Sequence, residues 1–81
     1  MVGSFECRII SPEAVLFSGA AEALTVVDAA GEMQILPGHA ETFVALANGQ
    51  VTVQKTDGTT TSFDSTGGVL HFYDGTAAVV L

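Results

Sequence analysis

Apolar and polar residues alternate along several segments of the chain. The alternation is clearest in residues 5–9, FECRI, and it recurs in residues 51–54 and 59–64. Because successive side chains of a strand point to opposite faces, each of these segments predicts a strand with one buried face. Three other segments are continuously apolar, as in strands covered on both faces or by a partner: residues 24–27, 69–73 and 77–81.

Turn signals divide the chain at short intervals. Asn48-Gly49, Asp57-Gly58 and Asp74-Gly75 are turn dipeptides, because these residue types tolerate the positive φ of tight turns. Breaks recur roughly every 8–12 residues, the spacing of a sandwich or barrel. Helical periodicity is absent; residues 12–17 could form one helical turn, which Gly19 would end. The sequence predicts a single all-β domain over residues 1–81, a flattened sandwich of two sheets with about nine or ten short strands.

The charge balance limits the classes of partner. The chain is 48% hydrophobic and 14% charged, and two basic residues, Arg8 and Lys55, stand against nine acidic ones, for a net charge of -7. This composition excludes disorder, which requires low hydrophobicity and many charges. Binding to nucleic acid, or directly to an anionic membrane surface, is disfavoured because both need several basic residues. We expect part of so apolar a surface to be covered by another protein.

The single cysteine and the short apolar runs indicate the compartment. Cys7 can form no internal disulfide and no cysteine-based zinc site, so a reducing compartment is expected. Its place in a strand pattern predicts a buried, unreactive thiol. The apolar runs are far shorter than the roughly 18 residues of a membrane span, and no signal-peptide pattern opens the chain. We therefore expect a soluble, cytoplasmic protein.

Candidate catalytic or metal-binding groups are few. Glu32, His39 and Glu41 could be imagined as a metal site, but no H-x-H or H-E-x-x-H spacing supports it. His71 falls on another predicted strand, where a packed or interfacial position is favoured. No serine lies in a G-x-S-x-G motif, and Gly67-Gly68 lacks the lysine and helix start of a phosphate-binding loop. We expect neither a catalytic site nor a cofactor nor a metal.

Two classes of non-catalytic protein remain as interpretations: a carrier domain and an interaction module. Swinging-arm carrier domains are small β-sandwiches that present a modified lysine at a hairpin tip, and Lys55 precedes the turn at 56–58. The acidic and methionine neighbours of such a lysine are missing, so Lys55 is better explained as a charge that guards a hairpin end. An interaction module is favoured, because the chain is short, apolar and without a catalytic constellation. Residues 31–41 combine Gly, Pro, Glu and His and are expected to form one exposed, functional loop.

Three motifs resemble one protein family. Ile-Ser-Pro-Glu at 10–13 precedes Leu-Phe-Ser-Gly at 16–19, residues 31–40 read Gly-Glu-Met-Gln-Ile-Leu-Pro-Gly-His-Ala, and residues 67–70 read Gly-Gly-Val-Leu. In this order and spacing they resemble the N-terminal β-sandwich domain of the epsilon subunit of F-type ATP synthase, over essentially the whole chain. The ten-residue middle motif is the most specific of the set.

The resemblance implies a mechanical role. Epsilon subunits belong to the central stalk of a rotary motor, bind the gamma subunit and rest on the polar loops of the membrane rotor ring. The implied protein is a non-catalytic subunit, without cofactor, that helps couple proton or sodium flow to ATP synthesis. It would be peripheral, at the cytoplasmic face of the energy-transducing membrane (most simply a bacterial plasma membrane), and would meet that membrane only through the complex.

The resemblance also implies two contact sites. The rotor-ring contact would comprise four positions of the 31–41 segment: Gly31, Glu32, Gly38 and His39. Glu32 would face a basic or polar group of the ring, in a loop shaped by its glycines and by Pro37. The gamma contact would lie on a sheet face bearing Ser11, Thr42 and Val44.

Two departures from the family pattern limit what is carried over. Family members usually continue into two C-terminal helices that can inhibit ATP hydrolysis or bind ATP. This chain ends at Leu81, after its last expected strand, so it is either a truncated or a naturally short form, and its initial Met favours the second. Neither self-inhibition nor ATP binding is therefore expected of it. Glu41-Thr42 stands where members commonly have a proline and an aliphatic residue, which adds a charge beside the ring-facing segment.

Overall fold

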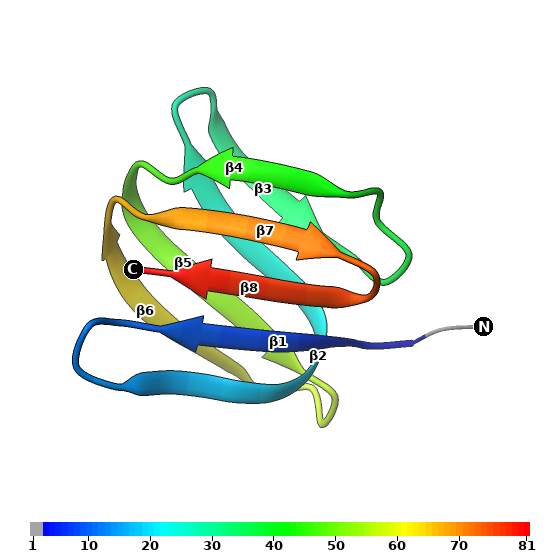
Figure 1. The fold of residues 1–81 in the computed structure, drawn as a ribbon. Helices are drawn as coiled ribbons and strands as arrows, with labels where there is room; N and C mark the ends of the chain where they lie inside the picture. Colours follow the sequence, from blue (N-terminus) through cyan, green and yellow to red (C-terminus); the bar gives the residue numbers. More distant parts are fainter. Residues whose placement is uncertain (1–2) are drawn as a thin grey trace.

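The computed structural model describes residues 3–81, which form eight strands (Figure 1). Met1 and Val2, the start of the expected domain, lie outside the described residues. The strands are β1 (Phe5–Ile10), β2 (Val15–Asp28), β3 (Gly31–Ile35), β4 (Thr42–Ala45), β5 (Asn48–Lys55), β6 (Thr60–Thr66), β7 (Val69–Tyr73) and β8 (Thr76–Val80). The all-β prediction is confirmed. The strand number is lower than expected because residues 15–28 form a single strand of 14 residues. Within residues 3–81 the structure has no helix long and apolar enough to cross a membrane.

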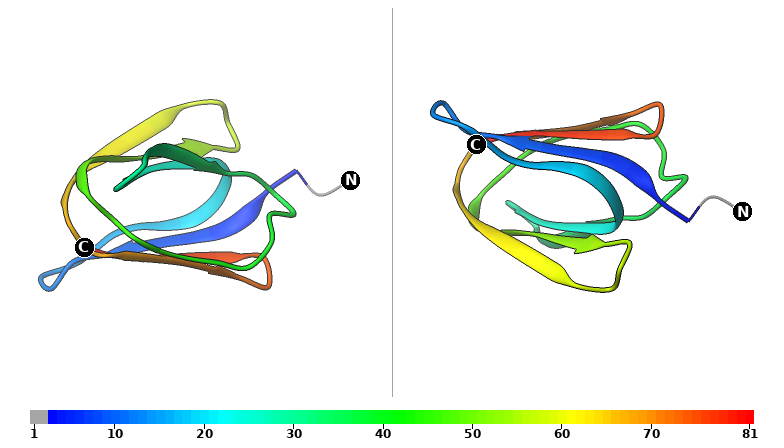
Figure 2. Two further views of the ribbon diagram at one scale, coloured as in Figure 1. Left: turned by 90° about the horizontal axis from the view of Figure 1, so that it is seen from above. Right: turned by 90° about the horizontal axis from the view of Figure 1, so that it is seen from below.

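The strands form one hydrogen-bonded sheet that folds over into two layers. Its order is β4-β7-β8-β1-β2-β5-β6, with β3 also paired to β2. The first part of β2, up to Ala21, pairs with β1, whereas Leu24 pairs with both Ile35 of β3 and Val53 of β5. A front layer of β4, β7, β8, β1 and the start of β2 therefore faces a back layer of β3, the end of β2, β5 and β6 (Figures 1 and 2).

The core lies between the two layers and follows the alternation in the sequence. Phe5, Cys7 and Ile9 of β1 are buried, and Glu6 and Arg8 between them are exposed. The core also takes side chains from five other strands and from the β4–β5 connection: Ala21, Leu24, Val26, Ile35, Leu46, Val51, Val53, Leu70, Phe72, Ala77 and Val79. Every strand with a clear period of two thus contributes one face to the core.

Cys7 is buried, as the strand pattern predicts. Its exposed fraction is 1%. Burial raises the pKa of the thiol to about 12, and the nearby charge of Glu6 adds to the shift. Since the thiolate is the nucleophile, a thiol that stays protonated at neutral pH is a weak nucleophile.

The segment that could have formed a helical turn is a tight turn followed by a strand. The Ser11 amide donates to the carbonyl of Ala14 at 2.8 Å, and the Ser11 hydroxyl oxygen accepts from the amides of Glu13 and Ala14 at 3.3 Å each. Val15 then begins β2 opposite Ile10. Pairing with β1 favours the extended conformation there, and a serine that bonds nearby amides is typical of such turns.

Gly68 marks a close approach between two parts of the backbone. Gly67 and Gly68 join β6 to β7 with φ values of +134° and +112°. A Cβ on Gly68 would lie 2.2 Å from the carbonyl oxygen of Val80, whereas a Cβ on Gly67 would have nothing within 4 Å. The sequence motif Gly67-Gly68 therefore serves β-sheet geometry rather than phosphate binding.

The two glycines separate the cost of backbone strain from the cost of the clash. We expect Gly67→Ala to lower the free energy of unfolding by about 1–2 kcal/mol, the strain of a left-handed residue with a Cβ. Gly68→Ala adds a collision with a backbone oxygen, so its cost should exceed that of Gly67→Ala by at least about 2 kcal/mol. Urea unfolding of both variants measures the difference, and equal midpoints would contradict it.

Candidate functional site

Residues 31–41, expected as one exposed loop, form a strand and a separate connection. Gly31–Ile35 is β3, paired along its length with Leu24–Asp28 of β2. Gly31 and Glu32 lie at the β2–β3 hairpin, whereas Gly38 and His39 lie beyond the other end of β3. The two ends of this strand are about 13 Å apart, at roughly 3.3 Å per residue. The expectation of one loop is therefore wrong, and its four proposed contact residues fall in two places.

The β2–β3 hairpin presents an acidic tip. The Asp28 carboxylate accepts a hydrogen bond from the Ala30 amide at 2.8 Å, and Gly31 completes the turn with φ +126°. Glu32 follows with an exposed side chain, and Val27 is its register partner. A turn stabilised by its own side chain holds the Glu32 carboxylate at one end of the molecule.

His39 is bonded within its own connection. Its Nδ1 lies 2.8 Å from the Ala40 carbonyl oxygen and 3.2 Å from the Thr42 hydroxyl, and its ring meets the buried Phe72 edge-on at 6.1 Å. The His39 amide also donates to the carbonyl of Leu36 at 3.1 Å. These contacts fix the turn that leads into β4, so the imidazole has a structural role.

The metal site considered from the sequence, Glu32, His39 and Glu41, is not formed. Glu32 lies at the far end of β3, His39 is bonded locally, and Glu41 reaches His71 instead, at 3.2 Å. Among residues 3–81 no three His, Cys, Asp or Glu side chains are placed to hold a metal ion.

The three expected gamma contacts do not share an outer face. Val44 is the register partner of the fully buried Leu70 and packs against the core, so its expected place on an outer face is wrong. Thr42 lies on the same side of β4, as alternation predicts, and donates its hydroxyl to the carbonyl of Ala40 at 3.0 Å. Ser11 caps the β1–β2 turn, across β7 and β8 from β4.

The outer side of the front layer is apolar and aromatic. Phe43, Tyr73, Val15 and Val80 are 70%, 58%, 53% and 44% exposed there, among six large hydrophobic side chains exposed within residues 3–81. Strand register places their neighbours on the same side. We call this surface the front face; its members are Ile10, Val15, Phe43, Ala45, Val69, His71, Tyr73, Ala78 and Val80. Arg8, which is the register partner of Ala78, is the basic residue of the front face.

The outer side of the back layer is polar and satisfied by its own hydrogen bonds. Gln50 donates to Asp64 at 3.3 Å, Thr52 and Ser62 share a bond of 2.9 Å, and Gln54 donates to Glu22 at 3.4 Å. These are cross-strand pairs between neighbouring strands of the back layer. The two outer sides of the sandwich thus differ sharply, because the front face carries four of the six large hydrophobic side chains exposed within residues 3–81.

His71 is the centre of an aromatic cluster on the front face. Its ring lies 5.4 Å from that of its cross-strand partner Phe43 and is stacked on that of Tyr73 at 6.0 Å. Its Nε2 lies 3.2 Å from the Glu41 carboxylate. Glu41, which departs from the family pattern, therefore ties the β3–β4 connection to β7. Of the packed or interfacial position predicted for His71, the structure shows packing against Phe43 and Tyr73. Phe43, which sequence reasoning missed, is the most exposed member.

Lys55 lies at the base of its hairpin rather than at the tip. Its Nζ stands 6.0 Å from the centroid of the Phe17 ring, and its amide donates to the carbonyl of Thr59. The tip is held by Asp57, whose carboxylate accepts from the Thr59 hydroxyl at 2.6 Å and from its amide at 2.9 Å. These bonds, the hydroxyl first, lower the pKa of Asp57. The packing of Lys55 favours a structural role over that of a carrier lysine.

Comparison with known proteins identifies the family. A sequence profile described as the β-sandwich domain of the ATP synthase delta/epsilon chain matches residues 4–81. The ATP synthase epsilon chain of Chromohalobacter salexigens is 35% identical over 79 residues, which cover 98% of this chain and 56% of that protein. The chain belongs to the ATP synthase delta/epsilon family. Its matched region is the β-sandwich domain of an epsilon subunit, as the three motifs indicate.

Further relatives and solved structures agree on this region. The epsilon chain of Micrococcus luteus is 42% identical over 61 residues, covering 75% of this chain and 67% of that one. A chain in a structure of the Euglena gracilis mitochondrial ATP synthase, containing OSCP, F1 and c-ring, matches with a TM-score of 0.90 at 23% identity. The match covers 99% of this chain and 51% of the Euglena chain. At this identity the likeness shows a shared fold. The chain thus spans about half to two-thirds of the length of these proteins.

Neighbouring residues of β4 should differ in how much the same substitution destabilises the fold. Val44→Asp places a carboxylate against the core, so we expect it to lower the free energy of unfolding by about 3 kcal/mol or more. Phe43→Asp changes an exposed position and should cost less than about 1 kcal/mol. Thermal or urea unfolding measures both values; a Val44→Asp variant as stable as Phe43→Asp would show that the inward orientation of Val44 is wrong.

Proposed function

We propose that this chain is the β-sandwich of a non-catalytic central-stalk subunit, which joins the gamma subunit to the rotor ring and thereby couples ion flow to ATP synthesis. The observation that carries the proposal is the contrast between the apolar front face and the self-satisfied polar back layer. Family membership supplies the type of complex, and the fold supplies one surface suited to a permanent protein contact.

The front face is proposed as the contact for gamma. Phe43 and Tyr73 are rigid, exposed aromatic side chains, the kind that contributes most to binding when a partner excludes water from them. Ser11 borders this face at the turn after Ile10. Thr42 and Val44 support the contact from beneath, by fixing the strand that carries Phe43, rather than by touching gamma.

The rotor-ring contact is proposed at the β2–β3 hairpin, through Gly31 and Glu32. The hairpin projects at one end of the sandwich, away from the connection that carries Gly38 and His39 (Figure 1). We therefore assign Gly38 and His39 to the turn that shapes β4 and not to the ring contact. A sandwich of two hydrogen-bonded layers, 34 × 24 × 19 Å in extent, is a stiff body between two such contacts.

The same proposal gives the location of the protein. As part of the complex it would be peripheral at the cytoplasmic face of an energy-transducing membrane, held there by gamma and by the polar loops of the ring. The named epsilon-chain relatives are bacterial proteins, which supports a bacterial plasma membrane. With -7 net charge and two basic residues, the domain has little means of binding anionic lipid by itself.

A single aspartate on the front face should prevent binding of gamma. We expect Phe43→Asp to weaken the affinity for purified gamma by at least about 30-fold, because it removes a central aromatic contact and buries a carboxylate. Thr60→Asp adds the same charge at an exposed position of β6 in the back layer and should change the affinity less than about twofold. Calorimetry measures the affinity of both variants for gamma. An equal loss of affinity in the two variants, or no loss with Phe43→Asp, would refute the front face as the contact.

Reversal of the charge at the hairpin tip should affect coupling and leave gamma binding intact. We expect Glu32→Lys to reduce ATP-driven proton pumping in reassembled membranes, since rim charges set orientation more than affinity. Asp64→Lys makes the same charge change on the back layer and serves as the control. Loss of gamma binding with Glu32→Lys, or normal pumping, would show that this tip does not meet the ring.

A further inference from the structure

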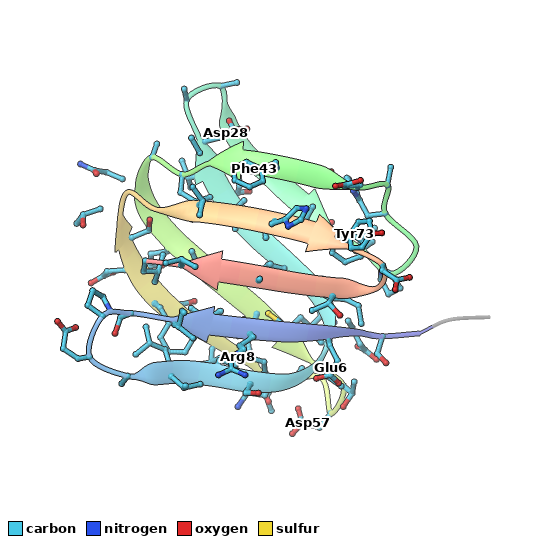
Figure 3. All side chains as sticks on the ribbon, in the orientation of Figure 1. Glu6, Arg8, Asp28, Phe43, Asp57 and Tyr73 are labelled. Carbon is cyan, nitrogen blue, oxygen red and sulfur yellow. The ribbon has the colours of Figure 1, made fainter. Side chains whose placement is uncertain are left out.

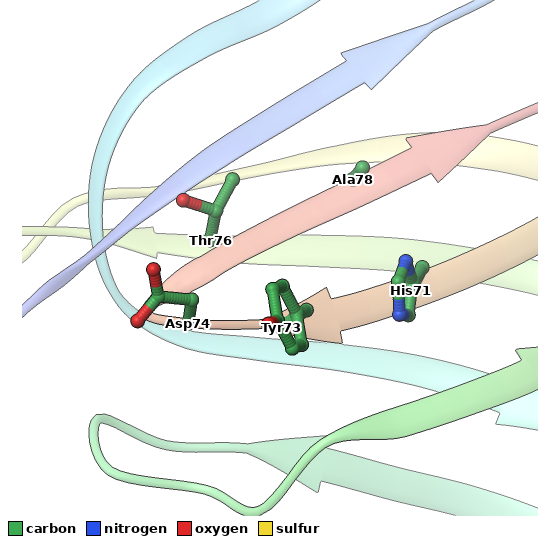
Figure 4. A pocket seen from close by; sticks show the side chains of 5 residues that line it. All are labelled: His71, Tyr73, Asp74, Thr76 and Ala78. Atoms are coloured by element: carbon green, nitrogen blue, oxygen red, sulfur yellow. The ribbon is translucent and has the colours of Figure 1, made fainter.

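A hollow opens in the front face beside the β7–β8 turn (Figure 4). Its volume is about 300 Å³, and five residues line it: His71, Tyr73, Asp74, Thr76 and Ala78. The hollow exists because the register pairs large residues of β7 with small ones of β8, Tyr73 with Thr76 and His71 with Ala78. Two aromatic rings thus form one wall, and a methyl group forms the floor.

Asp74 gives this aromatic hollow a negative end. It occupies the β7–β8 turn with φ +53°, which places its carboxylate beside Tyr73 and Thr76 (Figure 4). Within residues 3–81 no Lys or Arg forms an ion pair with Asp74, and the carboxylate that His71 Nε2 contacts, at 3.2 Å, is that of Glu41. The Thr76 hydroxyl adds an acceptor near the same end (Figure 4).

We propose that the hollow is a socket for a lysine or arginine side chain of the protein that docks on the front face, an inference that rests on the proposed function. A long basic side chain has an apolar stem and a charged head. The stem would lie over Ala78 and along the stacked rings of His71 and Tyr73, and the head would meet the Asp74 carboxylate. Aromatic faces attract cations as well, and exclusion of water by the docked partner strengthens both contacts.

The two basic residues of the chain do not compete for the socket. Arg8 is next to Ala78 in the register, but its side chain extends over β2, away from β8 (Figure 3). Lys55 lies 6.0 Å from the Phe17 ring, on another part of the sandwich. The surrounding charge of -7 favours a basic partner group over an acidic one.

Binding to gamma tests the socket without disturbing the fold. Asp74→Asn keeps the turn, because asparagine tolerates a positive φ as aspartate does. We expect it to raise the Kd for purified gamma about tenfold in low salt and to make that Kd less dependent on salt. Asp64→Asn removes the same charge from the back layer and should change the Kd less than about twofold. Tyr73→Leu keeps an apolar wall but loses the ring, and it too should weaken binding.

The outcomes separate this inference from the proposed function. If the unmodified chain binds gamma and Asp74→Asn behaves like Asp64→Asn, the socket is refuted and the front-face contact stands. If Asp74→Asn tightens binding, the partner group is acidic or apolar and the inference is likewise overturned. If the unmodified chain and every variant fail to bind gamma, the proposed function fails, and this inference with it.

Discussion

Both layers of the sandwich depend on β2, because this one strand belongs to both of them. Its first half completes the front layer beside β1, and its second half is the centre of the back layer between β3 and β5. The strand changes layer where its side chains are small, in the run Gly19-Ala20-Ala21, and where the register shifts between Ala21 and Ala23. Bulges and small residues are what allow a strand to bend sharply. The layers are therefore joined through the backbone as well as through the core.

This construction leaves two outer sides with different tasks. The back layer bonds its own side chains to one another, from Gln50 and Asp64 to Thr52 and Ser62. The front layer leaves Phe43 and Tyr73 more than half exposed. The apolar side is consistent with a domain that works inside an assembly.

Much of this structure follows from local pattern. The alternation in FECRI predicts the burial of Phe5, Cys7 and Ile9, and the continuous apolar runs in β7 and β8 match strands with one face in the core and one on the front face. The Gly, Pro and charged residues of the 31–41 segment are loop formers, so its local pattern predicts a loop. Pairing with the second half of β2 overrides that local preference over Gly31–Ile35.

The orientation of β4 could not be derived from its own four residues. Thr42, Phe43, Val44 and Ala45 are compatible with either face inward, because Phe43 and Val44 are both apolar. The choice depends on β7, whose buried Leu70 and Phe72 flank the half-buried His71. For a strand of this kind, pairing with its neighbour decides which side chains point to the core. The position of Phe43 on the front face can therefore be assigned only once the pairing is known.

The place of β8 in the sheet has a consequence for how the protein folds. This last strand lies between β7 and β1, and its parallel pairing with β1 joins residues 6–10 to residues 76–80. The pairing spans almost the whole chain, so this contact is among the most distant in sequence that the domain can make. Distant contacts of this kind slow folding, because a large loop must close before they form. During synthesis, β1 and β7 keep open edges until β8 has been made, and that interval is when the nascent domain is most exposed to pairing with the wrong strand.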